Sequence, residues 1–153
     1  MRVKNKKDMK SLKVAALALL ATATVSAQDL KKEEVPSDLM SNFEKEYANA
    51  TDVEWEKEDE LYKVEFDMDR NEYELWYDAS GRMTKIEKEL KVTELPQAIK
   101  SKISSSYASY KIDDIEIKEE NEKTTYEVEL EDGRKEITVI FDESGSVIKE
   151  FED

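Results

Sequence analysis

The sequence contains no cysteine and no histidine among its 153 residues. No disulfide can therefore staple the chain, and its stability must come from packing. Zinc, copper and haem sites lose their usual ligands, and Ser-His-Asp and Cys-His catalytic systems lose their imidazole. With only three glycines, phosphate-binding loops are absent as well. The side chains left for chemistry are carboxylates, lysine and tyrosine.

The first 27 residues show the three zones of a secretory signal peptide. Residues 1–13 are basic, residues 14–25 form an apolar run, and Val25-Ser26-Ala27 precedes Gln28. The apolar run of 12 residues is too short to span a bilayer, so a retained membrane anchor is the weaker alternative. We predict cleavage between Ala27 and Gln28, export to the periplasm or the medium, and no membrane attachment of the mature chain.

Acidic residues outnumber basic ones in the predicted mature chain. The signal peptide holds six of the 24 basic residues and one of the 38 acidic ones, which leaves 18 basic against 37 acidic side chains and a net charge of −19. Such a charge opposes DNA, RNA and anionic membranes, and we expect none of them as a partner. A cationic partner fits this charge, and so does simple solubility.

Residues 34–90 and 94–153 repeat one pattern in register. Each stretch opens with an apolar residue and a proline, Val35-Pro36 and Leu95-Pro96. Behind each proline, apolar residues recur every four positions, which predicts one face of a helix. These two rows are Leu39, Phe43 and Tyr47 in the first stretch and Ile99, Ile103 and Tyr107 in the second.

After each predicted helix the apolar period changes to two, which indicates strands. The alternating rows, matched between the stretches, are Val53 and Trp55 with Ile115 and Ile117; Tyr62, Val64 and Phe66 with Tyr126, Val128 and Leu130; and Tyr73, Leu75 and Tyr77 with Ile137, Val139 and Phe141. Tight Asp-x-Ser-Gly turns follow at 78–81 and 142–145, and fourth strands are expected near 83–89 and 147–151.

The predicted fold class is α+β, with two tandem repeats that each consist of one helix followed by a four-stranded antiparallel meander. The helix lies on the apolar face of the sheet. Units of this size bury little surface alone, so we expect the two to pack together or to form one continuous sheet. Residues 28–33 are polar, and we expect a disordered linker there.

Several of these segments together resemble the beta-lactamase-inhibitor-like, PepSY-like family of exported proteins. The segments are Val35-Pro36, Phe43, Tyr47, 52–55, 62–66 and 76–81 in the first stretch, and Leu95-Pro96, Tyr107, 126–130 and 140–145 in the second. The resemblance implies two units that present a concave sheet surface to a partner, as in beta-lactamase inhibitor protein. It does not imply inhibition, because such inhibitors carry disulfides that this chain cannot form and because a fold does not assign a function.

The sheet face opposite the helices is the candidate binding surface. Its predicted residues are Glu54, Glu56, Lys63, Glu65, Glu72 and Glu74 in the first repeat, and Glu116, Glu127, Glu129 and Glu136 in the second. Trp76 and Ile140 stand among these charges at matching positions. We predict that Trp76, Ile140, Lys63, Glu65 and Glu74 bind a partner; the alternative is that Trp76 and Ile140 pack at the junction of the repeats.

Two further interpretations complete the sequence-based hypotheses. Asp67, Asp69 and Asn71 alternate like the first ligands of a calcium loop, but an ordinary polar turn is the favoured interpretation, because Glu72 stands where such a loop needs glycine. Paired glutamates are too numerous to indicate a catalytic acid and base, and their alternation favours a solvated face. The leading hypothesis is an exported, non-catalytic module that binds a protein or peptide, with no resident cofactor; the alternative is an acidic calcium-responsive protein. The oligomeric state stays open.

Overall fold

The computed structural model describes residues 27–152 of the chain, so the predicted signal peptide lies outside the described residues except for Ala27. The elements of the first part are β1 (Ala27–Leu30), the 3-10 helix η2 (Lys32–Glu34), α2 (Ser37–Glu46), β2 (Thr51–Glu58), β3 (Leu61–Met68), β4 (Asn71–Tyr77) and β5 (Met83–Glu89). The second part contains the 3-10 helix η3 (Val92–Glu94), α3 (Gln97–Ser106), β6 (Lys111–Glu120), β7 (Lys123–Asp132), β8 (Lys135–Asp142) and β9 (Val147–Glu152). None of the helices in this described range is long and apolar enough to cross a membrane.

All nine strands belong to one antiparallel sheet, in the order of the chain from β1 to β9. The α+β class and the meander connections are confirmed, but the expected four-stranded sheets are not separate. Strand β5 pairs with β6 along residues 85–89, so hydrogen bonds run through the point where we expected one repeat to end. The continuous-sheet alternative is therefore the one realised, because a shared ladder leaves neither half with an extra open edge.

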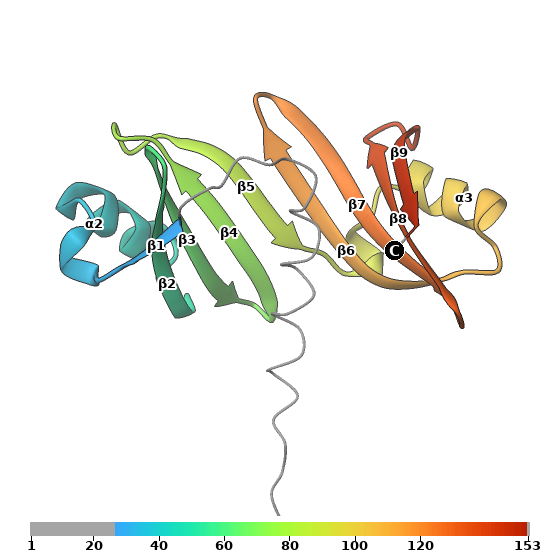
Figure 1. Cartoon of the computed structure of the whole chain (residues 1–153), viewed down its shortest axis with the longest axis horizontal. Helices are drawn as coiled ribbons and strands as arrows, with labels where there is room; N and C mark the ends of the chain where they lie inside the picture. Colours follow the sequence, from blue (N-terminus) through green and yellow to red (C-terminus); the bar gives the residue numbers. More distant parts are fainter. Residues whose placement is uncertain (1–26, 153) are drawn as a thin grey trace, which may run out of the picture.

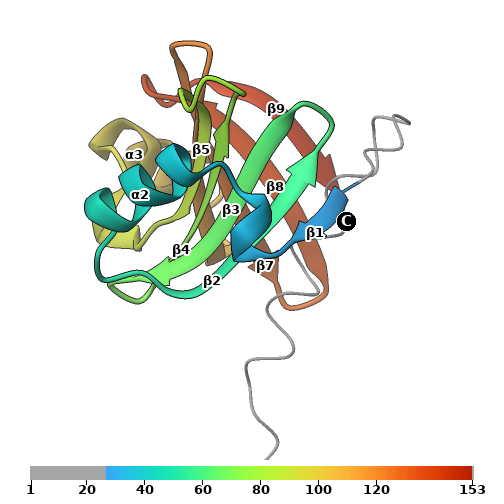
Figure 2. The same cartoon turned by 90° about the vertical axis from the view of Figure 1, so that its left-hand side faces the viewer.

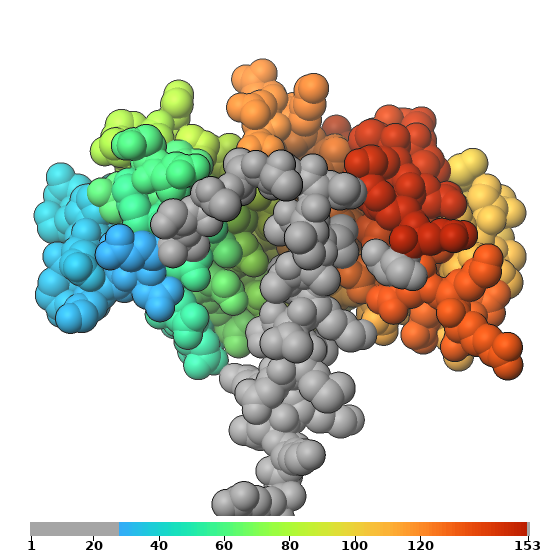
Figure 3. All heavy atoms as spheres, in the orientation of Figure 1, coloured from blue at the N-terminus to red at the C-terminus, as the bar shows by residue number. Residues whose placement is uncertain are grey.

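The two helices lie at opposite ends of the molecule and on the same side of the sheet. They form the left and right ends in Figure 1, where the strands occupy the middle, and the same two ends in the space-filling view (Figure 3). When the molecule is turned by 90°, α2 and α3 fall on one side of the strands (Figure 2). The opposite face of the sheet, which we call the open face, is left without a helix.

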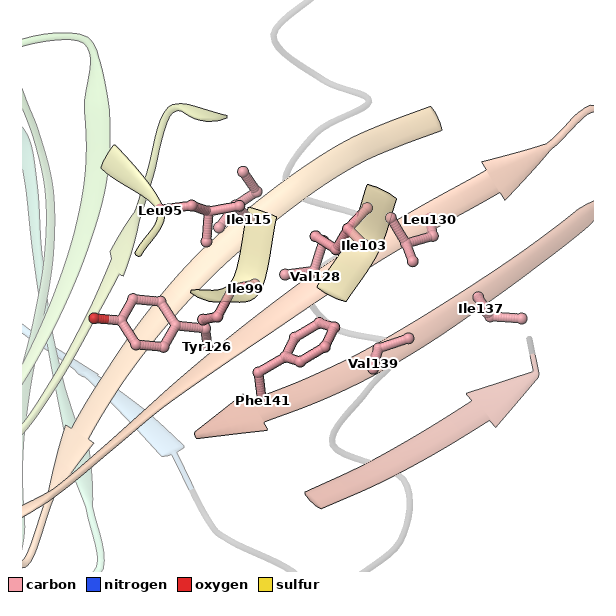
Figure 4. Close-up of a cluster of buried hydrophobic side chains, with 10 residues drawn as sticks. All are labelled: Leu95, Ile99, Ile103, Ile115, Tyr126, Val128, Leu130, Ile137, Val139 and Phe141. Atoms are coloured by element: carbon pink, nitrogen blue, oxygen red, sulfur yellow. The ribbon is translucent and has the colours of Figure 1, made fainter. Parts of the chain in front are cut away.

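Each helix covers its own hydrophobic core. The core under α3 consists of Leu95, Ile99, Ile103, Ile115, Tyr126, Val128, Leu130, Ile137, Val139 and Phe141 (Figure 4). The core under α2 consists of Val35, Leu39, Phe43, Trp55, Val64, Phe66, Leu75 and Tyr77. The helical and strand rows expected from the sequence thus point inward, since period four on the helix and period two on the strands put apolar side chains on one face.

One predicted match in the first strand is wrong. The sequence pattern matched Trp55 with Ile117, whereas the sheet register makes Ile115 the counterpart of Trp55. Trp55 lies opposite Val64 and Ile115 lies opposite Val128, and both Trp55 and Ile115 are buried. Both strands have a break in register near their starts, between Thr51 and Glu54 in β2 and between Ile112 and Asp114 in β6, so the two bulges correspond and do not cause the mismatch. In β2, the extra residue interrupts the inward–outward alternation at Val53. Val53 therefore points outward and is 40% exposed.

The predicted disordered linker is also wrong, since residues 28–30 form part of β1 and residues 32–34 form η2. Strand β1 pairs with β2 in the way that the end of β5 pairs with β6, and each leads into a 3-10 turn and a helix. The backbone N–H of Lys31 donates to Glu34 Oε2 at 2.7 Å, and that of Lys91 donates to Glu94 Oε2 at 2.9 Å. The structural pattern therefore begins one strand earlier than the hydrophobic pattern, and β5 serves both halves.

The Asp-x-Ser-Gly turns close the last hairpin of each half as predicted. Asp142 Oδ1 accepts hydrogen bonds from the Ser144 hydroxyl at 2.6 Å, from the backbone N–H of Ser146 at 3.0 Å and from that of Ser144 at 2.9 Å. These bonds, the hydroxyl's first, hold the pKa of the carboxyl below its usual value. Gly145 has a φ of 83°, and a Cβ there would lie 2.8 Å from the carbonyl carbon of Ala98 in α3. This turn therefore packs directly against the helix, and only glycine fits it.

The candidate binding surface on the open face

The open face is hollowed, and its hollow has a volume of about 860 Å³. Side chains from β2 through β9 line it, so the sheet curves around it with the helices on the outside. The lining includes all five predicted partner-binding residues, which are Lys63, Glu65, Glu74, Trp76 and Ile140. The sequence predicted only that these side chains lie on the same face of the sheet. The structure shows that they line one hollow, although they come from both halves of the chain.

Trp76 is less accessible than the prediction of a partner anchor requires. Its side chain is only 5% exposed, because the Lys85 ammonium lies 3.7 Å from the ring centroid and that of Lys63 lies 5.4 Å away. The indole N–H donates a hydrogen bond to Glu58 Oε2 at 2.8 Å. The ammonium groups of both lysines therefore pack against the Trp76 ring, and cation–π attraction holds them there.

Ile140 lies half-buried on β8, between Glu127 of β7 and Lys149 of β9. Neither Trp76 nor Ile140 sits on β5 or β6, the strands that join the two halves. Trp76 nevertheless packs against the joining strand β5, because it lies opposite Lys85, so packing of this residue near the junction stays a prediction. Both residues face the same hollow from opposite sides of that junction.

Lys63 is the cation at the centre of the first half of the hollow. Its ammonium lies 2.7 Å from Glu74, 3.8 Å from Glu65 and 3.9 Å from Glu56. Burial lowers the pKa of Lys63, but the hydrogen bond and the attraction of Glu74, together with Glu65 and Glu56, outweigh it and raise the pKa above its usual value. Three carboxylates around one buried ammonium form a charge-assisted network, which binds more strongly than a pair on the surface.

Four glutamates of the open face, Glu65 among them, have raised pKa values. Burial is the main cause in each case, followed by neighbouring carboxylates: the pKa of Glu72 rises to about 7, that of Glu129 to about 7 and that of Glu116 to about 8. For Glu116 the repelling neighbours are first Glu87 and then Glu127. A carboxylate that loses hydration and gains like charges holds its proton more tightly.

Strand register explains the repulsion from Glu127, while Glu87 acts from two residues along β5. Glu89 of β5 lies directly opposite Glu116 of β6, which in turn lies opposite Glu127 of β7. Like charges that face one another across a ladder are destabilising. Sequence analysis placed Glu116 and Glu127 on this face. It did not predict that Glu89 joins them in one row of glutamates, because that row forms only when β5 pairs with β6.

The predicted calcium ligands do not converge. Asp67 pairs with Glu72 and Met68 pairs with Asn71 in the β3–β4 hairpin, so Asp67 and Asn71 point to opposite faces of the sheet. Asp69 lies in the two-residue turn between them, where it has a φ of 54°. A cation cannot be held by ligands that diverge in this way.

Two other groups of three carboxylates do come close together. In each group, carboxylate oxygens lie within 4.8 Å of one another; the groups are Glu65, Glu72 and Glu74, and Asp113, Glu129 and Glu136. The first group already contacts an ammonium, because Lys63 binds Glu74 and Glu65. In the first half, the chain itself therefore supplies the cation that neutralises these acids.

A second hollow of about 590 Å³ lies between α2, β1 and the start of β2. Its lining includes Phe43, Tyr47, the outward-pointing Val53 and Trp55. The indole nitrogen of Trp55 is buried and has no hydrogen-bond partner within residues 27–152. Sequence analysis missed this hollow because it did not predict β1, which forms one of its walls.

The comparison with protein families identifies the class to which this fold belongs. The model of the family described as "Putative beta-lactamase-inhibitor-like, PepSY-like" matches residues 23–71 and again residues 62–149. The chain belongs to this family, as its sequence motifs indicated. The first match includes β1, in agreement with the structural start of the pattern. The search of curated proteins finds no significant match.

Solved structures show the same architecture. A "BLIP-like protein" from Bacteroides fragilis is 31% identical and has a TM-score of 0.60, with 76% of this chain and 86% of that chain covered. A DUF2874 family protein from Bacteroides uniformis is 17% identical with a TM-score of 0.64, and coverage is 76% and 88%. A protein of Bacteroides eggerthii, described as one of the "putative periplasmic proteins", is 13% identical with a TM-score of 0.65 and the same coverage.

Proposed function

We propose that this protein is an exported, non-catalytic binding module that holds a protein or peptide partner in the hollow of its open face. The observation that carries the proposal is the hollow itself, which eight successive strands line mainly with charged side chains, together with Trp76 and Ile140. A curved sheet that keeps its helices on the outside offers its concave side to a partner without rearrangement. Membership in a family named after beta-lactamase inhibitors supports a binding role.

The chemistry of the hollow supports binding more than catalysis. Its ionised side chains are engaged with one another, as in the contacts of Lys63 with Glu74 and of Lys85 with Glu87 at 2.5 Å. Raised carboxyl pKa values occur at Glu72, Glu116 and Glu129, each of which lies among other carboxylates on the sheet. Such values arise from crowding as readily as from a catalytic arrangement.

Export follows from the sequence and is supported by the related structures. The basic and apolar zones before Gln28 have the form of a signal peptide, and a structural relative is described as periplasmic. We infer that the mature protein works in the periplasm or outside the cell, and that its two halves derive from duplication of one helix-and-sheet unit. The partner would then be another exported protein or peptide.

Capture from a periplasmic extract tests the role of the hollow, with crosslinking and mass spectrometry as the readout. Ile140→Arg places a bulky side chain in the hollow, and Ser101→Arg places the same side chain on the exposed surface of α3 as the matched control. We expect wild type and Ser101→Arg to retain the same partner and Ile140→Arg to lose it, with all three proteins melting as folded domains. Retention of that partner by Ile140→Arg would refute the proposal.

A further inference from the structure

We propose that the hollow between α2, β1 and the start of β2 binds an aromatic side chain, a tyrosine above all, from a basic peptide segment. This site goes beyond the open face, because the two hollows share no lining residue. Its basis is a comparison of the two halves of the chain. The second half fills the corresponding place with a tyrosine of its own, and the first half leaves it open.

The two halves correspond residue by residue between each helix and the strand that follows it. The backbone N–H of Ala50 donates to the carbonyl of Tyr47 at 2.9 Å, and that of Tyr110 donates to the carbonyl of Tyr107 at 3.0 Å. Ala50 and Tyr110 also each lie five positions before the strand residue that pairs with a buried valine of the next strand. Ala50 therefore occupies in the first half the place that Tyr110 occupies in the second.

Tyr110 packs its ring beside the core of the second half. The residue is partly buried against the core under α3, and its ring centroid lies 6.2 Å from that of Tyr107, at an interplanar angle of 77°. In the first half the same place holds only the methyl group of Ala50, and Ala50 and Tyr47 line the hollow of about 590 Å³. The hollow thus lies where the second half contains an aromatic ring.

The walls of this hollow suit an aromatic ring. They include Met40, Phe43, Tyr47 and Val53. The rings of Phe43 and Tyr47 already stack on one another, with 5.3 Å between their centroids, whereas Val53 is 40% exposed. Aromatic rings attract one another in offset and edge-to-face arrangements, and their burial removes a large apolar area from water. A ring bound here would extend the aromatic contacts and cover the exposed valine.

Trp55 points independently to a ligand. It lines the hollow, and its buried indole N–H has no acceptor within residues 27–152. A buried donor without a partner is destabilising, and buried indole N–H groups usually find an acceptor. Ile115, the counterpart of Trp55, has no such donor, so the half that contains its own tyrosine lacks this need. A phenol oxygen in the hollow would supply the acceptor, which favours tyrosine over phenylalanine.

The charges of the hollow favour a basic segment around that ring. Lys32 is the single basic residue among the described residues that line it, and its ammonium pairs with Glu44. The other charged residues of the lining are the acids Asp29, Glu54 and Glu56. Four carboxylates against one ammonium attract a cationic peptide and speed its approach. The occupant that fits is therefore a tyrosine flanked by lysine or arginine.

Isothermal titration calorimetry with the purified mature chain at pH 7 tests this inference. The probes are peptides with blocked ends and the sequence Gly-Lys-Xaa-Lys-Gly, in which Xaa is tyrosine, phenylalanine or alanine. We expect the tyrosine peptide to bind most tightly and the phenylalanine peptide to bind about two- to tenfold more weakly, because it lacks the hydrogen-bond acceptor. We expect no measurable binding of the alanine peptide.

Two variants with the same added side chain locate the site. Ala50→Tyr gives the first half the residue of the second, whereas Ala108→Tyr changes an exposed residue outside the hollow, in the loop after α3. We expect Ala50→Tyr to melt at or above the wild-type temperature, because its ring is buried in the hollow, and to bind the tyrosine peptide about tenfold more weakly or less. Ala108→Tyr should bind it like wild type.

A third variant tests the hydrogen bond. Trp55→Phe removes the indole N–H and should bind the tyrosine and phenylalanine peptides equally. In wild type, the indole N–H signal of Trp55 in a nitrogen-15 spectrum, assigned with Trp76→Phe, should shift when the tyrosine peptide is added. An unshifted signal at saturation would overturn the role of Trp55, even if Trp55→Phe does not fold.

Unchanged affinity of folded Ala50→Tyr, or equal affinities of wild type for the tyrosine and alanine peptides, would overturn the inference. Equally tight binding of N-acetyltyrosinamide would assign the hollow to a small aromatic molecule instead of a peptide. Wild-type dimers in sedimentation that Ala50→Tyr abolishes would assign it to a second copy of the chain. Ile140→Arg alters only the open face and should bind the tyrosine peptide like wild type, so this inference and the proposed function fail in different variants.

Discussion

Replacement of Glu116 by glutamine should stabilise the protein at alkaline pH. Burial and the neighbouring carboxylates of Glu87 and Glu127 raise the pKa of Glu116 from 4.5 to about 8. In the folded state the neutral carboxyl is therefore favoured, and its contribution to stability is complete below about pH 4.5. That contribution is lost as the pH rises through 8, because the folded protein must then ionise a group that the unfolded chain ionises readily.

The size of the effect follows from the same pKa values. Each pKa unit corresponds to about 1.4 kcal/mol, so a rise from 4.5 to about 8 sets an upper limit of about 5 kcal/mol at high pH. Glu116 is partly exposed, and solvent screens some of this penalty, so we expect Glu116→Gln to add about 1–3 kcal/mol at pH 9. For a chain of this size, such a gain raises the melting temperature by about 3–12 °C.

Differential scanning calorimetry at pH 5 and pH 9 measures this prediction, with Glu143→Gln as the control because Glu143 is exposed and lies outside the hollow. We expect the melting temperature of Glu116→Gln to exceed that of wild type at pH 9 and to approach it at pH 5. The control should follow wild type at both values. If Glu116→Gln melts at or below the wild-type temperature at pH 9, the account of repulsion along the glutamate row is refuted.

Three further measurements test the fold itself. Gly145→Ala should destabilise the protein by at least about 1 kcal/mol more than Gly81→Ala in urea unfolding, because both glycines have positive φ but only the added Cβ at Gly145 collides with Ala98; equal losses would contradict the packing of this turn on α3. Leu75→Ala should cost about 2–5 kcal/mol, since its side chain is fully buried, and a loss under 1 kcal/mol would argue against the core under α2. Asp142→Ala should be less stable than wild type at pH 7, and the difference should vanish as the pH falls below about 4, because the depressed pKa of Asp142 contributes stability only while the group is ionised. A difference that persists at low pH would mean that turn geometry alone is responsible.

The positions of the buried residues were largely predictable from the sequence. Leu39 and Phe43 at helical spacing, and Val64 and Phe66 at strand spacing, are buried in one core as their periods require. The hydrophobic period did not predict burial correctly where a strand is irregular, as at Val53 beside the bulge of β2. It failed again at β1, which is too short and too polar to show alternation and is held in place by pairing with β2.

The candidate site was predictable as a face but not as a set of contacts. Alternation assigned Lys63, Glu65, Glu74, Trp76 and Ile140 to the side opposite the helices, and all five line one hollow. The burial of Trp76 under two lysines could not be read from its position, because it depends on where the side chains of neighbouring strands come to rest.

The sequence alone determined the class of fold, the two hydrophobic rows beneath the helices and the tight turns, because each depends on residues close together in the chain. The tertiary structure decided that β5 joins the two halves into one sheet and that Glu89, Glu116 and Glu127 face one another across three strands. These contacts join residues from different halves of the chain, and no local preference fixes their register. The hollow therefore takes its arrangement of charges, with Lys63 among three carboxylates in the first half and Glu116 opposite Glu127 in the second, only from the folded sheet.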